Sequence, residues 1–299
     1  MLTGEYLNQW LDTFVRPFRA ANTAACYRRA IAALPPSVCG CELQQLNALH
    51  IQAALNQQAV KHPRAAQLTF AMLHAALTKA ECMRLVDRSP MIGCVKPLHQ
   101  SARADVLSVS QLSAYLTAAR SQRGFVLLLL MATCGLRRSE ALGLQWRDID
   151  LTGGWLTVSR QRIRINHGYQ AAPLKSRSAQ RVLPLPPPLV AELAAHRADQ
   201  RERAFVGWVC DMTPEALRKS HRAALAAAGL PLSVTLHGLR HSMATAAAAQ
   251  GTPMKILQGI LGHSKYQLTA DLYAAHLSAD SFVPYVAQLT NVLGWYQSV

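Results

Sequence analysis

Strand-like patterning occupies one short part of this sequence. Apolar and polar residues alternate with a period of two at 155–158, 162–165 and 181–185, and Asn166-His167-Gly168 is a turn signal. Elsewhere the apolar residues recur at helical spacing. The pattern predicts a mainly α protein with one small, antiparallel, three-stranded sheet. Pro184 is expected to place the third strand at an edge, because proline cannot donate to a ladder.

The N-terminal third carries helical patterning throughout. Apolar residues recur at helical spacing in four runs, at 7–14, 24–34, 48–57 and 63–84. We therefore expect a four-helix domain at 1–96. The aperiodic, proline-containing stretch from Ser89 onward is expected to be exposed. The interdomain linker is placed at 97–106 and a second domain at 107–299.

Helical patterning resumes in the second domain. Its most apolar run, Phe125 to Met131, is too short to span a bilayer. We expect this run in a buried helix at 124–134 of a protein with no membrane segment. Further helices are expected after Leu107 and at 187–203, 213–228 and from 237 onward.

The charge of the chain is strongly one-sided. Lysine and arginine number 31 against 16 acidic residues, which gives a formal net charge of +15. Such an imbalance favours a polyanionic partner, nucleic acid before membrane. We expect the basic residues near helix ends of the first domain to meet the DNA backbone, although solvated faces are the alternative: Arg28, Arg29, Lys61 and Arg64.

Cysteine usage indicates neither a disulfide framework nor a metal site. The seven cysteines form no CxxC pair and no zinc spacing, and their number is odd. The first residues lack the basic and apolar regions of a signal peptide. A cytoplasmic protein with reduced thiols and no bound metal is expected.

Polar residues with chemical potential gather between 237 and 273. On a helix His237, Arg240 and His241 share one face, and His263 and Tyr273 follow on two further short helices. By themselves these are consistent with surface residues of a small bundle. Two places upstream add basic residues: Arg137, with Glu140 one helical turn on, and Lys175 at an expected hairpin tip.

Five motifs in order make the chain resemble the tyrosine recombinase (phage integrase) family. They are Thr-Cys-Gly-Leu-Arg-Arg-Ser-Glu from 133, Leu-Lys-Ser-Arg-Ser from 174, His-Gly-Leu-Arg-His from 237, Leu-Gly-His-Ser from 261 and Thr-Ala-Asp-Leu-Tyr from 269. Residues 5–11 and 25–29 resemble, more weakly, that family's helical, SAM-like core-binding domain. The resemblance spans nearly the whole chain and implies a site-specific DNA recombinase that acts on double-stranded DNA.

The resemblance also implies a catalytic set of six residues: Arg137, Lys175, His237, Arg240, His263 and Tyr273. The two arginines would hold the non-bridging oxygens of a phosphodiester, where negative charge gathers in the transition state. Tyr273 would attack phosphorus and form a 3′-phosphotyrosine, with His237 as its base and Lys175 as acid for the 5′-oxygen. His263 would bond the phosphate, and Glu140 would support the site. The covalent ester keeps the bond energy, so neither ATP nor metal is expected.

Several departures from the family pattern indicate a branch of it. Gly238 stands where many relatives have an acidic residue, and ten residues separate His263 from Tyr273 where many relatives have nine. The longer spacing favours a phage or mobile-element integrase, and the core-binding domain begins almost at Met1, without an N-terminal arm-binding domain. A homotetramer on DNA that exchanges the apolar tail at 277–299 is expected, with an accessory directionality or DNA-bending protein.

Four other functions remain as alternatives. A resolvase of chromosome or plasmid dimers belongs to the same family. A type IB topoisomerase shares the catalytic set, and a DNA-binding regulator without catalysis would share the fold. A metallohydrolase using His237, His241 and His263 is disfavoured, because Arg240 would lie inside the cation site and the sequence has no HExxH motif.

Overall fold

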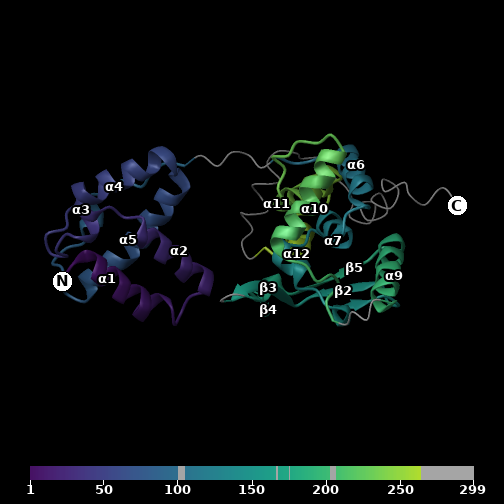
Figure 1. Cartoon of the computed structure of the whole chain (residues 1–299), viewed down its shortest axis with the longest axis horizontal. Helices are drawn as coiled ribbons and strands as arrows, with labels where there is room; N and C mark the ends of the chain where they lie inside the picture. Colours follow the sequence, from purple (N-terminus) through teal and green to yellow (C-terminus); the bar gives the residue numbers. More distant parts are fainter. Residues whose placement is uncertain (100–104, 166–167, 175, 203–206, 264–299) are drawn as a thin grey trace. The chain divides into compact units, whose positions relative to one another are not determined.

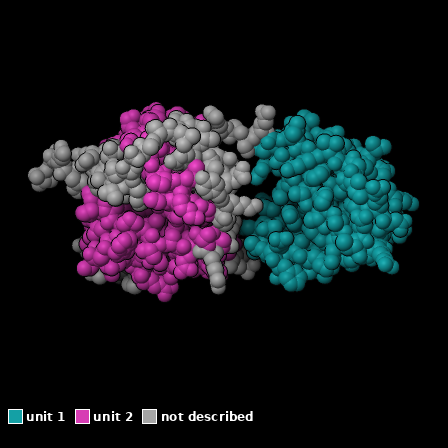
Figure 2. All heavy atoms as spheres, turned by 180° about the vertical axis from the view of Figure 1, so that it is seen from behind, with its two compact units in different colours: residues 1–102 teal, residues 103–299 magenta. Residues whose placement is uncertain are grey.

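The computed structural model describes residues 1–299 apart from 100–104, 166–167, 175, 203–206 and 264–299 (Figure 1). The chain divides into two compact units, Met1–Ala102 and Arg103–Val299 (Figure 2). Many more of the described residues lie in helices than in strands, and the strands form two small antiparallel sheets. The expected mainly α fold is therefore confirmed. None of the described helices combines the length and the apolar character that crossing a membrane requires.

The first unit is built from helices around one apolar core. Its helical segments are α1 (Thr3–Trp10), the π-helical turn η1 (Leu11–Val15), α2 (Ala21–Ala32), α3 (Pro36–Cys39), α4 (Ala48–Lys61) and α5 (Pro63–Cys82). Tyr6 of α1 buries its ring and donates its hydroxyl to the carbonyl of Ala76 in α5 at 2.6 Å. The single turn α3 was not expected; it begins with Pro36 at its first position, where a missing N–H costs nothing.

The stretch after α5 is mostly exposed, as expected from its prolines, but it is anchored at one turn. Ser89 caps a short 3₁₀ helix, η2 (Pro90–Gly93), and both Ser89 and Met91 are buried. The backbone N–H of Val95 then bonds Gln52 Oε1 of α4 at 2.7 Å. Met91 thus anchors a single turn, whereas the side chain of Val95 is 70% exposed and most of the stretch stays open to solvent.

The second unit surrounds a helix that is buried on all sides. This helix, α7 (Phe125–Thr133), is covered by α6 (Val109–Ala119) and α11 (Leu236–Ala249), as its uniformly apolar sequence predicts. Ser108 caps α6 and Thr235 caps α11. The remaining helical elements are α8 (Arg138–Leu142), η3 (Trp146–Asp148), η4 (Arg177–Ala179), α9 (Pro187–Glu202), α10 (Pro214–Ala227) and α12 (Met254–Leu261).

The strands form two sheets where one was expected. A three-stranded antiparallel sheet has the order β1-β2-β5, from Ile149–Asp150, Trp155–Val158 and Arg181–Pro184, with β5 at an edge as expected. The middle predicted strand instead begins at Arg160 and forms a separate hairpin, β3 (Arg160–Ile165) with β4 (Gly168–Pro173).

The strand β4 was not expected. Its sequence, Gly-Tyr-Gln-Ala-Ala-Pro, has one aromatic and no β-branched residue, so it carries little strand signal. Pairing with the next segment along the chain also closes a shorter loop than pairing with β5. The hairpin partner of β3 is therefore β4, and β3 and β5 do not form the hairpin at whose tip Lys175 was expected.

Candidate active site

Arg240 is the most deeply buried charged group of the site. It lies in the first turns of α11, and only 2% of its surface is exposed. Its Nη1 donates to the carbonyl of Gly135 and its Nη2 to the carbonyl of Leu261, each at 2.5 Å. Each of these nitrogens carries a second hydrogen. Two backbone carbonyls therefore fix the plane of the guanidinium and leave donors for a further acceptor.

Gly135 has to be glycine for this arrangement to exist. It follows α7 with a φ of +62°, and a Cβ atom there would lie 2.1 Å from Cε of Met243 in α11. Both the backbone conformation and the space exclude a side chain. The close approach brings the carbonyl of Gly135 to Arg240, 105 residues later in the chain.

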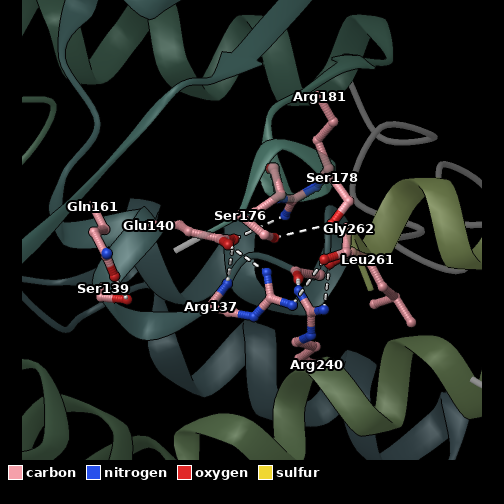
Figure 3. Close-up of polar contacts among 12 residues, drawn as sticks. Arg137, Ser139, Glu140, Gln161, Ser176, Ser178, Arg181, Arg240, Leu261 and Gly262 are labelled. Carbon is pink, nitrogen blue, oxygen red and sulfur yellow. Dashed lines mark hydrogen bonds and ion pairs between the residues drawn. The ribbon is translucent and has the colours of Figure 1, made fainter. Parts of the chain in front are cut away.

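Arg137 is held beside Arg240 by different partners. It is the N-cap of α8, where its backbone N–H and its Nη1 bond the two oxygens of Glu140 at 2.9 and 2.6 Å. Its Nη2 donates to the carbonyl of Gly262 at 3.0 Å (Figure 3). Because Leu261 and Gly262 are consecutive, the two arginines bond neighbouring carbonyls at the end of α12. Their guanidinium groups thus lie together, although the sequence separates them widely.

Glu140 joins two arginines through one buried carboxylate. Its Oε2 also accepts from Nη2 of Arg181 at 2.9 Å, and both residues of this pair are buried. Burial alone would raise the pKa of the Glu140 carboxyl, but the bonds and charges of Arg181 and Arg137 outweigh it, so the pKa is lowered. Glu140 is therefore ionised at neutral pH and bonds Arg137 through both of its oxygens.

Arg181 was not among the residues predicted for the site. A signal was present, because strand alternation puts Arg181 on the same face as buried Leu183. A charge facing a core needs an opposite charge.

The histidines of the site are held neutral. His237 and His241 are one turn apart on α11, with ring centroids 4.5 Å apart at 85°. Partial burial, then the charges of His241, Arg240 and Arg137, lower the pKa of His237 to about 4. Burial, then Arg240, Arg137 and the two other histidines, lower the pKa of His263 to about 4. His237 lies one turn before Arg240 on α11, and His263 follows Gly262, whose carbonyl Arg137 bonds. Both imidazoles are therefore close to the arginines and neutral at pH 7.

His263 owes its position to a left-handed glycine. Gly262 ends α12 with φ 59° and ψ 48°, and a Cβ there would lie 3.1 Å from Ser178 O and from Ala179 Cα. The backbone at Gly262 therefore lies against η4 and the side chain of Arg181. The N–H of His263 then bonds the carbonyl of Gln258 at 3.2 Å.

A basic pocket lies next to His237. It has a volume of about 490 Å³, and its lining includes Arg138 of α8 and Arg218 and Arg222 of α10. The last two are one helical turn apart on an exposed face. None of the three was singled out from the sequence, because single arginines on helices give no signal until the helices are packed together.

The remaining predicted residues are placed as follows. Lys175 and Tyr273, like the expected tail at 277–299, lie outside the described residues. The basic residues expected to contact DNA from the first unit are all exposed: Arg28, Arg29, Lys61 and Arg64. Lys61 and Arg64 line one groove together with Lys96 and His99.

Comparison with known proteins agrees with this geometry. The model of the phage integrase family matches residues 105–279, more than half of the chain. The chain therefore belongs to the phage integrase family, the tyrosine recombinases. No match is found among curated proteins.

Two solved structures illustrate the likeness in fold. One is the Tn1549 transposon integrase in complex with a circular intermediate DNA, at 18% identity and a TM-score of 0.81, over 97% of this chain and 99% of that chain. Another is a lambda integrase dimer bound to a COC′ core site, at 18% identity and a TM-score of 0.70, over 94% of this chain and 99% of that chain.

Proposed function

We propose that this protein is a site-specific DNA recombinase of the integrase type, which cuts and rejoins DNA through a 3′-phosphotyrosine intermediate. The observation that carries the proposal is the convergence of Arg137 and Arg240 on neighbouring carbonyls, with neutral His237 and His263 beside them. Two fixed cations suit an anionic ester that becomes more negative during reaction. A neutral imidazole can accept the proton of an attacking hydroxyl or donate its own N–H to the phosphate.

The arginines serve the phosphate itself. In the pentacoordinate transition state the non-bridging oxygens gain charge, and planar guanidinium groups donate to such oxygens with two hydrogen bonds each. Burial and the charge of Arg137 lower the pKa of Arg240 to about 9, which still leaves it protonated at neutral pH. Since both groups are oriented before DNA arrives, little reorganisation is needed during reaction.

The bond changes follow from the remaining residues of the set. The phenolic oxygen of Tyr273 forms a bond to phosphorus, its proton passes to His237, and the bond from phosphorus to the 5′-oxygen breaks. Lys175 gives the departing 5′-oxygen its proton. Attack by a 5′-hydroxyl of another strand reverses these steps and rejoins the DNA. His263 donates to the phosphate, and neither ATP nor metal enters the scheme.

Several features support duplex DNA as the partner. Both similar structures contain DNA, a circular intermediate in the transposon integrase and a COC′ core site in the lambda integrase. The basic pocket beside His237 would receive phosphates next to the one that is cut, and the exposed cations of the first unit would grip the backbone farther along. The ten-residue spacing before Tyr273 favours integration and excision of a mobile element over resolution of chromosome or plasmid dimers.

The assembly and setting are proposed with the function. Strand exchange needs four active sites, so we propose a homotetramer on DNA in which residues 277–299 of each chain pack on a neighbour. A DNA-bending or directionality protein would assist it. The domain division proposed is a core-binding domain at 1–96, a linker at 97–106 and a catalytic domain at 107–299, in a cytoplasmic protein.

A covalent-trapping experiment tests the chemistry. The protein is incubated in EDTA with duplexes that carry random sequence around a nick, so that the cut end diffuses away. We expect an adduct that survives detergent and that blocks exonuclease from the 3′ side only. Sequencing the trapped DNA identifies the site.

Two tyrosine variants show whether the adduct forms through the proposed nucleophile. Tyr273→Phe must abolish the adduct, whereas Tyr27→Phe removes the same atom from a ring stacked on Trp10 and must not. An adduct that needs added metal, or that persists without the Tyr273 hydroxyl, contradicts the mechanism. Relaxation of supercoils with no preferred sequence would indicate a topoisomerase instead.

A further inference from the structure

Gln161 is a polar residue buried at the inner face of the β3–β4 hairpin, with 8% of its surface exposed. Its Nε2 donates to the carbonyl of Pro173 at 2.9 Å, and its Oε1 accepts from Oγ of Ser139 at a longer 3.4 Å. Only the amide nitrogen can donate to a carbonyl, so both contacts agree on the orientation of the amide. Gln161 thus connects α8 with the last residue of β4, two positions before Lys175.

The chain after position 175 is tied to the same helix. Arg181 donates Nη1 to the carbonyl of Ala179 and Nη2 to Glu140 of α8, both at 2.9 Å. In the segment before Ala179, the hydroxyl groups of Ser176 and Ser178 form a hydrogen bond at 2.9 Å (Figure 3). Neighbouring residues of α8, Ser139 and Glu140, therefore hold the two flanks of Lys175.

Arg137 is the N-cap of α8, the helix that carries Ser139 and Glu140. The bonds of Ser139 and Glu140 therefore connect Arg137 with the segments on either side of Lys175. At the C-terminal end of α8, Gly143 lets β3 come close to the helix. A Cβ atom at position 143 would lie 2.8 Å from the N atom of Arg162 and from the carbonyl carbon of Gln161. The separation of helix and strand is thereby set by backbone contact. The Gln161 amide then adds a directional bond at the strand end that leads to Lys175.

We propose that Gln161 is a positioning residue for the general acid. It holds the end of β4 so that Lys175 reaches the departing 5′-oxygen of the phosphate that Arg137 binds. The proposal rests on the function proposed above, in which Lys175 supplies that proton. A buried amide is costly unless it is bonded. An apolar side chain would fill the same space, so the amide is explained by the bond it makes to Pro173.

The test uses a DNA substrate whose 5′-bridging oxygen is replaced by sulfur. A thiolate leaves without being protonated, so this substrate removes the need for a general acid and for its placement. Gln161→Met keeps the length of the side chain and loses the donor. We expect it to cut ordinary DNA about tenfold more slowly or worse, within the range of general-acid effects. We expect it to cut the sulfur-containing DNA within about twofold of the wild-type rate, as a leaving group that needs no proton predicts.

Three comparisons make the outcome decisive. Lys175→Ala should show the same rescue with a larger initial loss, and Gln170→Ala, an exposed glutamine on β4, should show no loss. Gln161→Asn, which keeps an amide that is too short to reach Pro173, serves if the methionine variant does not fold.

If Lys175→Ala is rescued by sulfur and the Gln161 variants are not, Gln161 acts only in folding and the inference is wrong. If Lys175→Ala itself is not rescued, the proposed role of Lys175 fails first.

Discussion

The cations that we propose for DNA binding in the first unit and those of the candidate active site are held in opposite ways. In the first unit Arg28, Lys61 and Arg64 are exposed, and none of them forms an ion pair with another described residue. In the second unit Arg240 and Arg181 are nearly enclosed and bonded to carbonyls and a carboxylate.

The difference separates affinity from chemistry. An exposed cation attracts DNA through a long-range field that salt screens, and its exact position matters little. A buried guanidinium has already lost its water and its freedom, so it can meet developing charge at one fixed point. In the proposed function the exposed cations of the first unit hold the polyanion, and the buried arginines of the second act on one phosphate of it.

Arg240 should show the largest effect if placement rather than charge matters. Arg240→Ala removes a fixed donor and leaves the carbonyls of Gly135 and Leu261 without it, so we expect adduct formation to fall about 100- to 1000-fold. Arg240→Lys keeps the charge but cannot bond both carbonyls. We expect this variant to form the adduct less than about tenfold faster than Arg240→Ala. Single-turnover cleavage measures both, with circular dichroism to confirm folding. A lysine variant close to wild type would break the comparison.

Glu140 should show an intermediate effect that depends on pH. Glu140→Gln removes the charge between Arg137 and Arg181, and we expect the free energy of unfolding at pH 7 to fall by about 3–5 kcal/mol. Because the folded pKa lies below the usual 4.5, this stabilisation is present above pH 4.5 and is lost as pH falls through the folded pKa. The gap between variant and wild type in urea unfolding should therefore close in acid.

An exposed pair supplies the contrast for Glu140. Asp12→Asn breaks the ion pair with Arg16, in which both side chains are about half exposed, and should cost less than about 1 kcal/mol. Equal losses for Asp12→Asn and Glu140→Gln would mean that burial does not distinguish the two units.

Lys61 and Arg64 should show the smallest effects, on binding alone. Replacing either by alanine should weaken DNA binding a few-fold and reduce the salt slope of log K by about 1, while cleavage of bound DNA stays unchanged. Arg16→Ala is the matched control, since Asp12 already pairs its charge. Titrations at several salt concentrations give the slope. A fall in the cleavage rate of saturated DNA would mean that these cations also act on the chemistry.

Much of the architecture was readable in the sequence because it depends on local interactions. Caps at Ser108 and Thr235, the uniformly apolar α7 and the glycine at the end of α12 specify helix bounds through neighbouring atoms. The strand β4 was missed because its residues have weak intrinsic preference and pair only once β3 is in place. Met91 anchors one turn of a stretch that is otherwise mostly exposed, and the sequence did not indicate it, because a pattern needs several residues to be recognised and anchoring needs one.

The sequence by itself determined the elements and the chemical types of the site: two arginines, histidines on a helix face, and a carboxylate one turn from Arg137. Only the tertiary structure decided that Arg137 and Arg240 bond consecutive carbonyls, that Arg181 shares Glu140, and that Gln161 reaches Pro173. Helical periodicity relates residues a few positions apart, whereas these contacts join residues from 12 to 125 positions apart. Close packing around α7 brings them together, and no local pattern records which distant groups will meet.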